Sequence, residues 1–346
     1  MATTPRGALH WLGDRLGVAL LLDGETERRV VRERLELHIV AAVIWLLTLE
    51  IASGILLLMH YRPSGNEAFE SVVAINGAIP FGALVRGIHA WSTHLLVAAL
   101  LGYVFLLLYR RAYTSPREVA WMTAVLLLAT TFAFALTGSV LTWNADAHVH
   151  AAIAGRLSER LPLVGHWLER FVLGGSGVGG RTLERAFGFH AAVLPAMVTV
   201  FAILHVRARQ RAGAKEPDEG DRGILLRDLV LTVATEWAAI FFLVLALATF
   251  VPPATGAPLD LKQPTEGGLH PAWYFLALHR LLAITPGELL GVDGVAVVGT
   301  FIMAGWGVLT IIPFLDRHGA KWIRYFAVVS LVVGALLTLF AAYAPR

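Results

Sequence analysis

Seven long apolar runs constrain the fold of this 346-residue chain more than any other feature. They cover roughly residues 36–60, 83–109, 119–143, 187–207, 228–251, 293–315 and 322–344. Each run is close to the length of about 20 apolar residues that a helix needs to cross a bilayer. Only 15% of the residues are charged, against about 25% in a typical soluble domain. The sequence therefore predicts an all-α integral membrane protein with seven spans and excludes a water-soluble globule.

The basic residues indicate how the spans are oriented. Four segments rich in arginine or lysine alternate with the apolar runs so that all fall on one side: the N-terminal arm, 110–117, 207–227 and 316–324. Short basic loops stay in the cytoplasm, so we expect a cytoplasmic N-terminus in a bacterial-type cytoplasmic membrane. The net charge of +3 comes from arginines clustered at the span ends and gives no indication of a nucleic-acid partner.

The polar stretch Ala212–Arg222 is the clearest internal boundary, because it separates four spans from three. We therefore expect four parts: an N-terminal cytoplasmic arm over 1–35 with an amphipathic helix near Leu9–Leu22, a four-helix domain over 36–211, a cytoplasmic linker over 212–227 and a three-helix domain over 228–346.

Cysteine is absent from the chain, whereas histidine occurs 13 times. The chain therefore cannot hold a thiolate-bound iron–sulfur cluster, a covalently attached c-type haem or a disulfide. Any metal or redox centre in it has to be held by histidine, carboxylate or another oxygen ligand.

Four histidines lie deep inside the apolar runs: His89 and His94 in the second, His190 and His205 in the fourth. Ionisable groups inside spans are costly and are functional candidates by default. A neutral imidazole hydrogen-bonded to a neighbouring helix is the alternative for each histidine taken alone. A facing pair on two helices of a bundle is instead typical of a haem held by two histidines.

The spacing of these histidines predicts where a second haem would lie. His190 and His205 are 15 residues apart, which is about 22 Å along a helix and nearly on one face. On the second span, the position about 14 residues after His89 is Tyr103, and His94 is about half a turn out of phase with it. The second span thus offers one good ligand where two stacked haems would require two.

Short motifs along the chain match those of a known family. They are His60-Tyr61-Arg62-Pro63, Arg86-Gly87-Ile88-His89-Ala90-Trp91-Ser92, Pro116-Arg117-Glu118, Thr137-Gly138-Ser139-Val140-Leu141-Thr142-Trp143, Phe189-His190, Leu194-Pro195 and His205. With these motifs the chain resembles cytochrome b of the quinol-oxidising bc-type complexes, from about residue 30 to residue 344. It is most similar to the chloroplast-type bf form fused to its small fourth subunit.

The resemblance implies two b haems between the first four spans. The iron of the outer haem would be held by His89 and His190. Gly54 and Gly138 match the glycines that let the flat ring approach the helices, and Arg86 matches the arginine that neutralises the haem propionates. Every feature that the family implies for the outer site is present.

At the inner site only His205 matches the family. Tyr103 stands at the position of the expected histidine, Leu106 at that of an arginine, and Val40 and Ala124 at those of two helix glycines. We therefore expect the inner haem to be absent or strongly altered. A haem held by His205 and Tyr103 stays open as an alternative, because tyrosine can ligate haem iron.

The family's quinol-binding motif, Pro-Glu-Trp-Tyr, corresponds to Pro271-Ala272-Trp273-Tyr274. Trp273 and Tyr274 are the quinone-site residues that this implies, but an alanine replaces the proton-accepting glutamate. Proton-coupled oxidation needs a base within hydrogen-bond reach. His270 and His279 are nearby in sequence and could replace that carboxylate, or they could be ordinary surface histidines.

The resemblance implies a membrane electron-transfer subunit that carries an outer b haem and exchanges electrons between the quinone pool and periplasmic carriers. We expect it to act within a bc-like complex, with a Rieske-type iron–sulfur protein, c-type cytochromes or both as partners, and as a possible homodimer. One alternative is a structural membrane anchor with little redox activity of its own. A transporter with a histidine proton relay is a weaker alternative, because matched halves with interrupted helices are not evident.

Overall fold

The computed structural model describes residues 29–30, 35–212, 224–258, 271–289, 291–316 and 322–343. Within these residues, seven helical segments are long and apolar enough to cross a membrane. They are α3 (Leu35–Leu58), α5 (Gly82–Tyr109), α6 (Glu118–Leu141), the continuous run of α9 (Gly180–Gly188), η2 (Phe189–Val193) and α10 (Leu194–Arg211), α11 (Leu226–Phe250), α13 (Gly294–Leu315) and α14 (Trp322–Tyr343). The predicted all-α fold with seven spans is confirmed. The amphipathic helix predicted near Leu9–Leu22 and most of the predicted linker lie outside the described residues.

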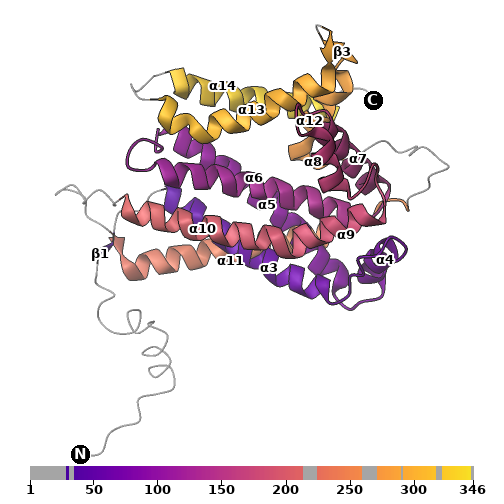
Figure 1. Ribbon diagram of the computed structural model, residues 1–346. Coiled ribbons are helices and arrows are strands. Elements are labelled where there is room, and N and C mark those ends of the chain that lie inside the picture. Colours follow the sequence, from indigo (N-terminus) through magenta and orange to yellow (C-terminus); the bar gives the residue numbers. More distant parts are fainter. Residues whose placement is uncertain are drawn as a thin grey trace, which may run out of the picture.

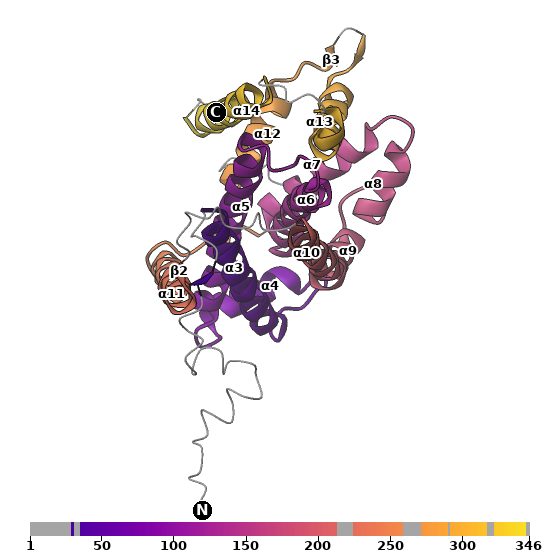
Figure 2. The ribbon, with the colours of Figure 1, turned by 90° about the vertical axis from the view of Figure 1, so that its left-hand side faces the viewer.

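The long helices lie side by side (Figure 1). In chain order, α3 packs on α5, α5 on α6, and α6 on α10. Helix α11 packs on α5 and α3, whereas α13 packs on α6 and α14 on α5. Viewed along the bundle, α11 and the pair α13–α14 therefore lie on opposite sides of the first helices (Figure 2).

One apolar core joins the early and late helices. Its buried members include Leu46 of α3, Leu100 of α5, Trp121 of α6, Val244 of α11 and Ile323 of α14. Because these side chains share one cluster, the last three long helices pack directly on the helices that carry the candidate histidines.

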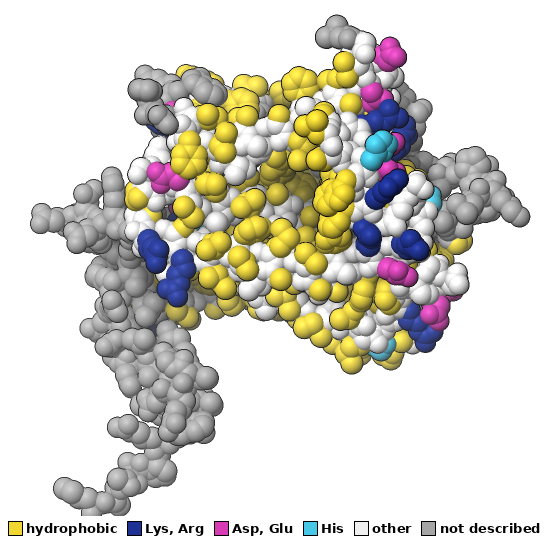
Figure 3. All heavy atoms as spheres, viewed as in Figure 1, with side chains coloured by type: hydrophobic (Ala, Val, Ile, Leu, Met, Phe, Trp, Pro, Cys, Tyr) yellow, Lys and Arg dark blue, Asp and Glu magenta, His cyan; other side chains and the backbone are white. Residues whose placement is uncertain are grey.

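Apolar side chains also cover the outer faces of the helices. Ile51, Phe242, Phe301 and Leu339, for example, are each more than half exposed. Figure 3 shows such side chains along the length of the helices, with charged side chains gathered toward the two ends. A soluble protein rarely exposes a continuous apolar surface of this kind, whereas helices with satisfied backbones and apolar faces suit a bilayer. The chain is a multi-pass membrane protein.

The shorter elements gather at two ends of the bundle (Figure 1). One end, called the α4 end below, carries α4 (Ala68–Gly77), α7 (Ala145–Glu159), α8 (Gly165–Leu173), α12 (Trp273–Ile284) and the hairpin of β3 (Glu288–Leu289) with β4 (Val292–Asp293). The opposite end carries the antiparallel pair of β1 (Arg29–Val30) and β2 (Ile224–Leu225). The segments predicted to be outside thus share one end. Which end faces the cytoplasm stays a prediction.

The fourth span begins at Gly180, earlier than the predicted start at 187. Helix α9 carries Arg181, Glu184 and Arg185. These charged residues lower the mean hydropathy of the first turns, so the apolar run begins later than the helix does.

His190 lies in an unusually wide helical turn. In η2 the backbone N–H of Leu194 donates to the carbonyl of Phe189, five residues earlier. Pro195 follows directly and has no amide hydrogen to donate to an ordinary helical turn. Wide turns of this type are frequent at functional sites.

Candidate functional site

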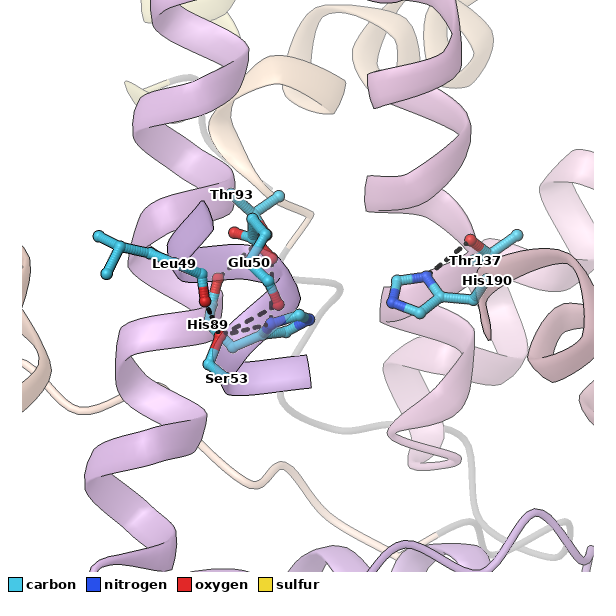
Figure 4. Close-up of polar contacts among 7 residues, drawn as sticks. All are labelled: Leu49, Glu50, Ser53, His89, Thr93, Thr137 and His190. Carbon is cyan, nitrogen blue, oxygen red and sulfur yellow. Dashed lines mark hydrogen bonds and ion pairs between the residues drawn. The ribbon is translucent and has the colours of Figure 1, made fainter. Parts of the chain in front are cut away.

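His89 and His190 face each other from α5 and η2, as Figure 4 shows. Their ring centres are 6.1 Å apart and their planes make an angle of 66°. An imidazole nitrogen binds a transition-metal ion at about 2 Å, so two imidazoles on opposite sides of one ion have ring centres about 6 Å apart. The spacing of this pair, called the bis-histidine site below, fits a metal ion between the rings.

Both imidazoles are anchored through Nδ1 (Figure 4). The Nδ1 of His89 is 3.0 Å from Ser53 Oγ and 3.0 Å from Glu50 Oε2. The Nδ1 of His190 is 3.0 Å from Thr137 Oγ1. Such partners fix the orientation of a ligating imidazole and its tautomer. They leave Nε2 of each ring available to a metal ion.

Gly54 and Gly138 lie beside the two rings. A Cβ atom at Gly54 would be 3.4 Å from His89 Cε1, and one at Gly138 would be 3.0 Å from His190 Cε1. The second distance is shorter than an ordinary carbon contact, so a side chain there would displace the ring. Both glycines therefore keep space next to the facing imidazoles, as a flat cofactor would require.

Arg86 lies one turn before His89 on α5. Its guanidinium donates to the carbonyl oxygens of Pro253 at 2.9 Å and Ala254 at 2.6 Å, and to Asn76 Oδ1 at 3.3 Å. It thus holds the segment after α11 against α5. The contact with a haem propionate stays a prediction.

Tyr103 and His205 also meet between α5 and α10, and this pair is called the tyrosine–histidine site below. The Tyr103 hydroxyl is 2.9 Å from His205 Nε2. The Nδ1 of His205 is 2.9 Å from the carbonyl oxygen of Ala120 and 3.1 Å from Thr123 Oγ1. Because a carbonyl oxygen can only accept, Nδ1 carries the proton and Nε2 accepts from the Tyr103 hydroxyl.

Charged residues extend this contact toward the end of the bundle opposite α4. Arg209 donates to the Tyr103 hydroxyl oxygen at 2.5 Å and to Glu36 at 3.1 Å. Arg110 donates to the other carboxylate oxygen of Glu36 at 3.3 Å. Each polar group of the tyrosine–histidine site therefore has a protein partner.

The tyrosine–histidine site does not fit an iron ion between its two side chains. Ligands on opposite sides of one ion are about 4 Å apart, whereas this oxygen and nitrogen are 2.9 Å apart. Ala124 is fully buried in the adjoining core, and Val40 packs against the same cluster. The space that glycines would leave is filled.

Trp273 and Tyr274 are the first two residues of α12, and Ala272 precedes them. His270 lies outside the described residues. The Tyr274 ring contacts His94, with ring centres 5.5 Å apart, and Phe132 at 6.1 Å. Tyr274 is thus brought against α5 and α6, and Trp273 contacts the Tyr274 ring at a ring-centre distance of 5.3 Å.

His279, further along α12, pairs with His150 of α7 at a ring-centre distance of 5.4 Å. His150 is buried, and neither of its ring nitrogens has a hydrogen-bond partner in the described part of the chain. Burial lowers the pKa of His279 to about 4, with the neighbouring His150 adding to the shift. Burial also lowers the pKa of His150. Both imidazoles are therefore neutral near pH 7.

Sequence reasoning missed three residues of these sites. Glu50 carried a usable signal, since an acidic residue inside an apolar run is a functional candidate. Arg209 and His150 carried none, because each meets its partner only through packing of helices distant in sequence.

Comparisons with known proteins identify the family of the chain. Residues 35–213 match the family described as cytochrome b/b6/petB, and residues 261–344 match the one described as cytochrome b (C-terminal)/b6/petD. The chain is 31% identical over 301 residues to the cytochrome bc complex cytochrome b subunit of Chlorobaculum thiosulfatiphilum, a match covering 84% of this chain and 68% of that protein. It is 32% identical over 208 residues to cytochrome b6 of Gloeobacter violaceus, covering 60% of this chain and 97% of that protein.

A solved structure described as a hyperthermophilic respiratory Complex III has the same fold. Its TM-score is 0.80 at 23% identity, and the match covers 98% of this chain and 92% of that chain. The cytochrome b/b6/petB family matches more than half of this chain, and the chain aligns with more than two thirds of the Chlorobaculum protein. The chain therefore belongs to the cytochrome b/b6 family.

Proposed function

We propose that this chain is the cytochrome b subunit of a bc-type complex and transfers electrons through a b haem held by His89 and His190. The facing imidazoles with a ring-centre distance of 6.1 Å carry this proposal. A haem bound there supplies a one-electron carrier whose iron alternates between two oxidation states. Membership of the cytochrome b/b6 family supports haem b as the cofactor.

The protein residues around this haem have distinct tasks. Ser53 and Thr137 orient the two imidazoles through Nδ1. Gly54 and Gly138 keep the adjoining space free of side chains. Arg86, one turn from His89, offers its remaining N–H donors to a propionate.

We propose that the chain carries one b haem rather than two. The hydrogen bond between Tyr103 and His205, and the side chains of Val40 and Ala124, support the absence of the second. The second site lies about 21 Å along α5 from the first, at 14 residues of about 1.5 Å each. Without a carrier there, electron exchange is confined to the α4 end, which is the predicted periplasmic side.

Quantifying b haem against protein in the complex purified from membranes tests both proposals. We expect one non-covalent b haem per chain. Two haems would contradict the single-haem proposal. A chain without haem would contradict electron transfer altogether and favour the structural anchor.

We also propose that quinol binds beside α12, against Trp273 and Tyr274. His279 and His150 take the place of the carboxylate that is missing at Ala272, because a neutral imidazole can accept a proton from a quinol hydroxyl. The orphaned ring nitrogens of His150 support this role. A b haem held by His89 and His190 would accept one of the two electrons of the quinol, and a Rieske-type iron–sulfur or c-type cytochrome partner would accept the other.

Replacing His279→Asn tests the quinol proposal. Loss of a general base costs on the order of 100-fold or more in rate, so quinol-dependent reduction of the b haem should fall by about that factor while the haem spectrum is retained. Ala272→Glu in the same background should restore much of the rate. An unchanged rate in His279→Asn would contradict the proposed role.

A further inference from the structure

Glu50 is a carboxylate in the middle of the first span, α3. Its side chain is only 15% exposed. In the described part of the chain, His89 is the only basic side chain within ion-pair distance of it. Burying a carboxylate costs free energy unless it is paired and hydrogen-bonded. The residues that contact Glu50 therefore indicate which group its charge influences.

Two contacts hold the Glu50 carboxylate against α5 (Figure 4). Oε2 is 3.0 Å from His89 Nδ1, and Oε1 accepts from the Thr93 hydroxyl at 2.9 Å. Thr93 is one turn after His89 on the same helix, and its hydroxyl also lies 3.1 Å from the His89 carbonyl oxygen. The carboxylate is thereby fixed beside the imidazole.

The two facing histidines differ in this respect. Each has a hydroxyl at 3.0 Å from Nδ1, supplied by Ser53 for His89 and by Thr137 for His190. Among the described residues, a carboxylate is added to the hydroxyl at His89 alone. The Nδ1–H of His89 is therefore shared between a neutral and a charged acceptor.

We infer that Glu50 is a positioning residue that lowers the reduction potential of the b haem through His89. The inference rests on the proposed function, in which His89 ligates that haem. A carboxylate that accepts from Nδ1–H makes the imidazole a more basic ligand, which stabilises the oxidised iron more than the reduced iron. Its negative charge close to the site acts in the same direction.

A redox titration of the b haem in the assembled complex, followed by its visible absorbance, tests the inference. Glu50→Gln keeps the side-chain length and an accepting oxygen but removes the charge. We expect the midpoint potential of this variant to be more positive. The ratio of reduced to oxidised haem at a given potential should rise tenfold, which corresponds to about 59 mV for a one-electron couple. Glu50→Met, which removes both charge and acceptor, should shift it in the same direction at least as far. Glu50→Asp, which keeps the charge, should stay closer to the original potential than either.

Glu36→Gln is the matched control. Glu36 lies on the same helix and is equally buried, with 14% of its side chain exposed, but it pairs with Arg209 and Arg110 at the other end. Its replacement should leave the haem potential unchanged.

The outcomes separate this inference from the function on which it rests. An unchanged potential in Glu50→Gln, with the haem spectrum intact, would overturn the inference and leave the haem site standing. Loss of haem from both neutral variants would assign Glu50 to holding His89 in place, and would also overturn it. An unmodified complex without b haem would instead refute the proposed function.

Discussion

The bis-histidine site and the tyrosine–histidine site lie on the same pair of helical segments but are built differently. His89 and Tyr103 share α5, and His190 and His205 share the run from η2 to α10. At the first site two rings face each other with their centres 6.1 Å apart. At the second, a hydroxyl and a ring nitrogen touch at 2.9 Å. The same helix pairing thus supports either an open ligand pair or a closed hydrogen bond.

The partners of the ring nitrogens explain what each site needs. Both nitrogens of His205 have protein partners, so this site is satisfied by the chain alone. At the bis-histidine site the hydrogen bonds from the described residues reach Nδ1 of each ring. A ligand could be bound by both Nε2 atoms of the bis-histidine site, whereas at the tyrosine–histidine site Nε2 of His205 is already bonded to the Tyr103 hydroxyl.

The largest effect should come from removing one histidine from each site in turn. His190→Ala deletes one of the two proposed iron ligands, and we expect the b-type absorbance of the purified chain to disappear. His205→Ala should retain that absorbance in full, because both ring nitrogens of this residue are already bonded to protein groups. Equal haem loss in the two variants would show that the sites do not differ as described.

The next largest effect on haem content should come from restoring ligands and space at the tyrosine–histidine site. In Tyr103→His combined with Val40→Gly and Ala124→Gly, a second histidine pair and the two missing glycines are restored. We expect the ratio of b haem to chain to rise from one to two, measured on the purified protein.

The single variant Tyr103→His is the control for this triple variant. Its ratio should stay at one, because Val40 and the fully buried Ala124 still occupy the adjoining space. Two haems in the single variant would show that these side chains do not close the site. One haem in the triple variant would show that more than the ligand and the glycines has been lost.

The sequence predicted the fold well because hydropathy depends only on local composition. Seven spans follow from seven apolar runs, and the structure bears them out. The start of the fourth span at Gly180 was not predicted, because the charged turns of α9 have low hydropathy although they belong to the same helix. Helix continuity is set by backbone bonding, which composition reports only indirectly.

Site residues could be predicted from the sequence where one residue is unusual in its own position. An intramembrane histidine such as His89 stands out by itself, and so does the tyrosine at 103 once a spacing is expected. The contact of Arg209 with Tyr103 and the pairing of His150 with His279 join segments more than 100 residues apart. Such pairings depend on how helices pack, which one sequence does not specify.

The smallest effect should come from removing a single oxygen atom at the closed site. Tyr103→Phe deletes the donor to His205 Nε2 and the acceptor for Arg209. Leaving buried polar groups unpaired costs about 1–3 kcal/mol, so we expect the free energy of unfolding in detergent to fall by that amount with the haem content unchanged.

Tyr109→Phe is the matched control, because this residue is on the same helix but 46% exposed. Substitutions at such positions usually change stability by less than about 0.5 kcal/mol. If Tyr103→Phe changed the free energy of unfolding as little as Tyr109→Phe, the hydrogen bond would not stabilise the tyrosine–histidine site. The side chains of Val40 and Ala124 alone would then have to exclude a haem there. If haem content fell together with stability in Tyr103→Phe, the two sites would be coupled through α5 rather than independent.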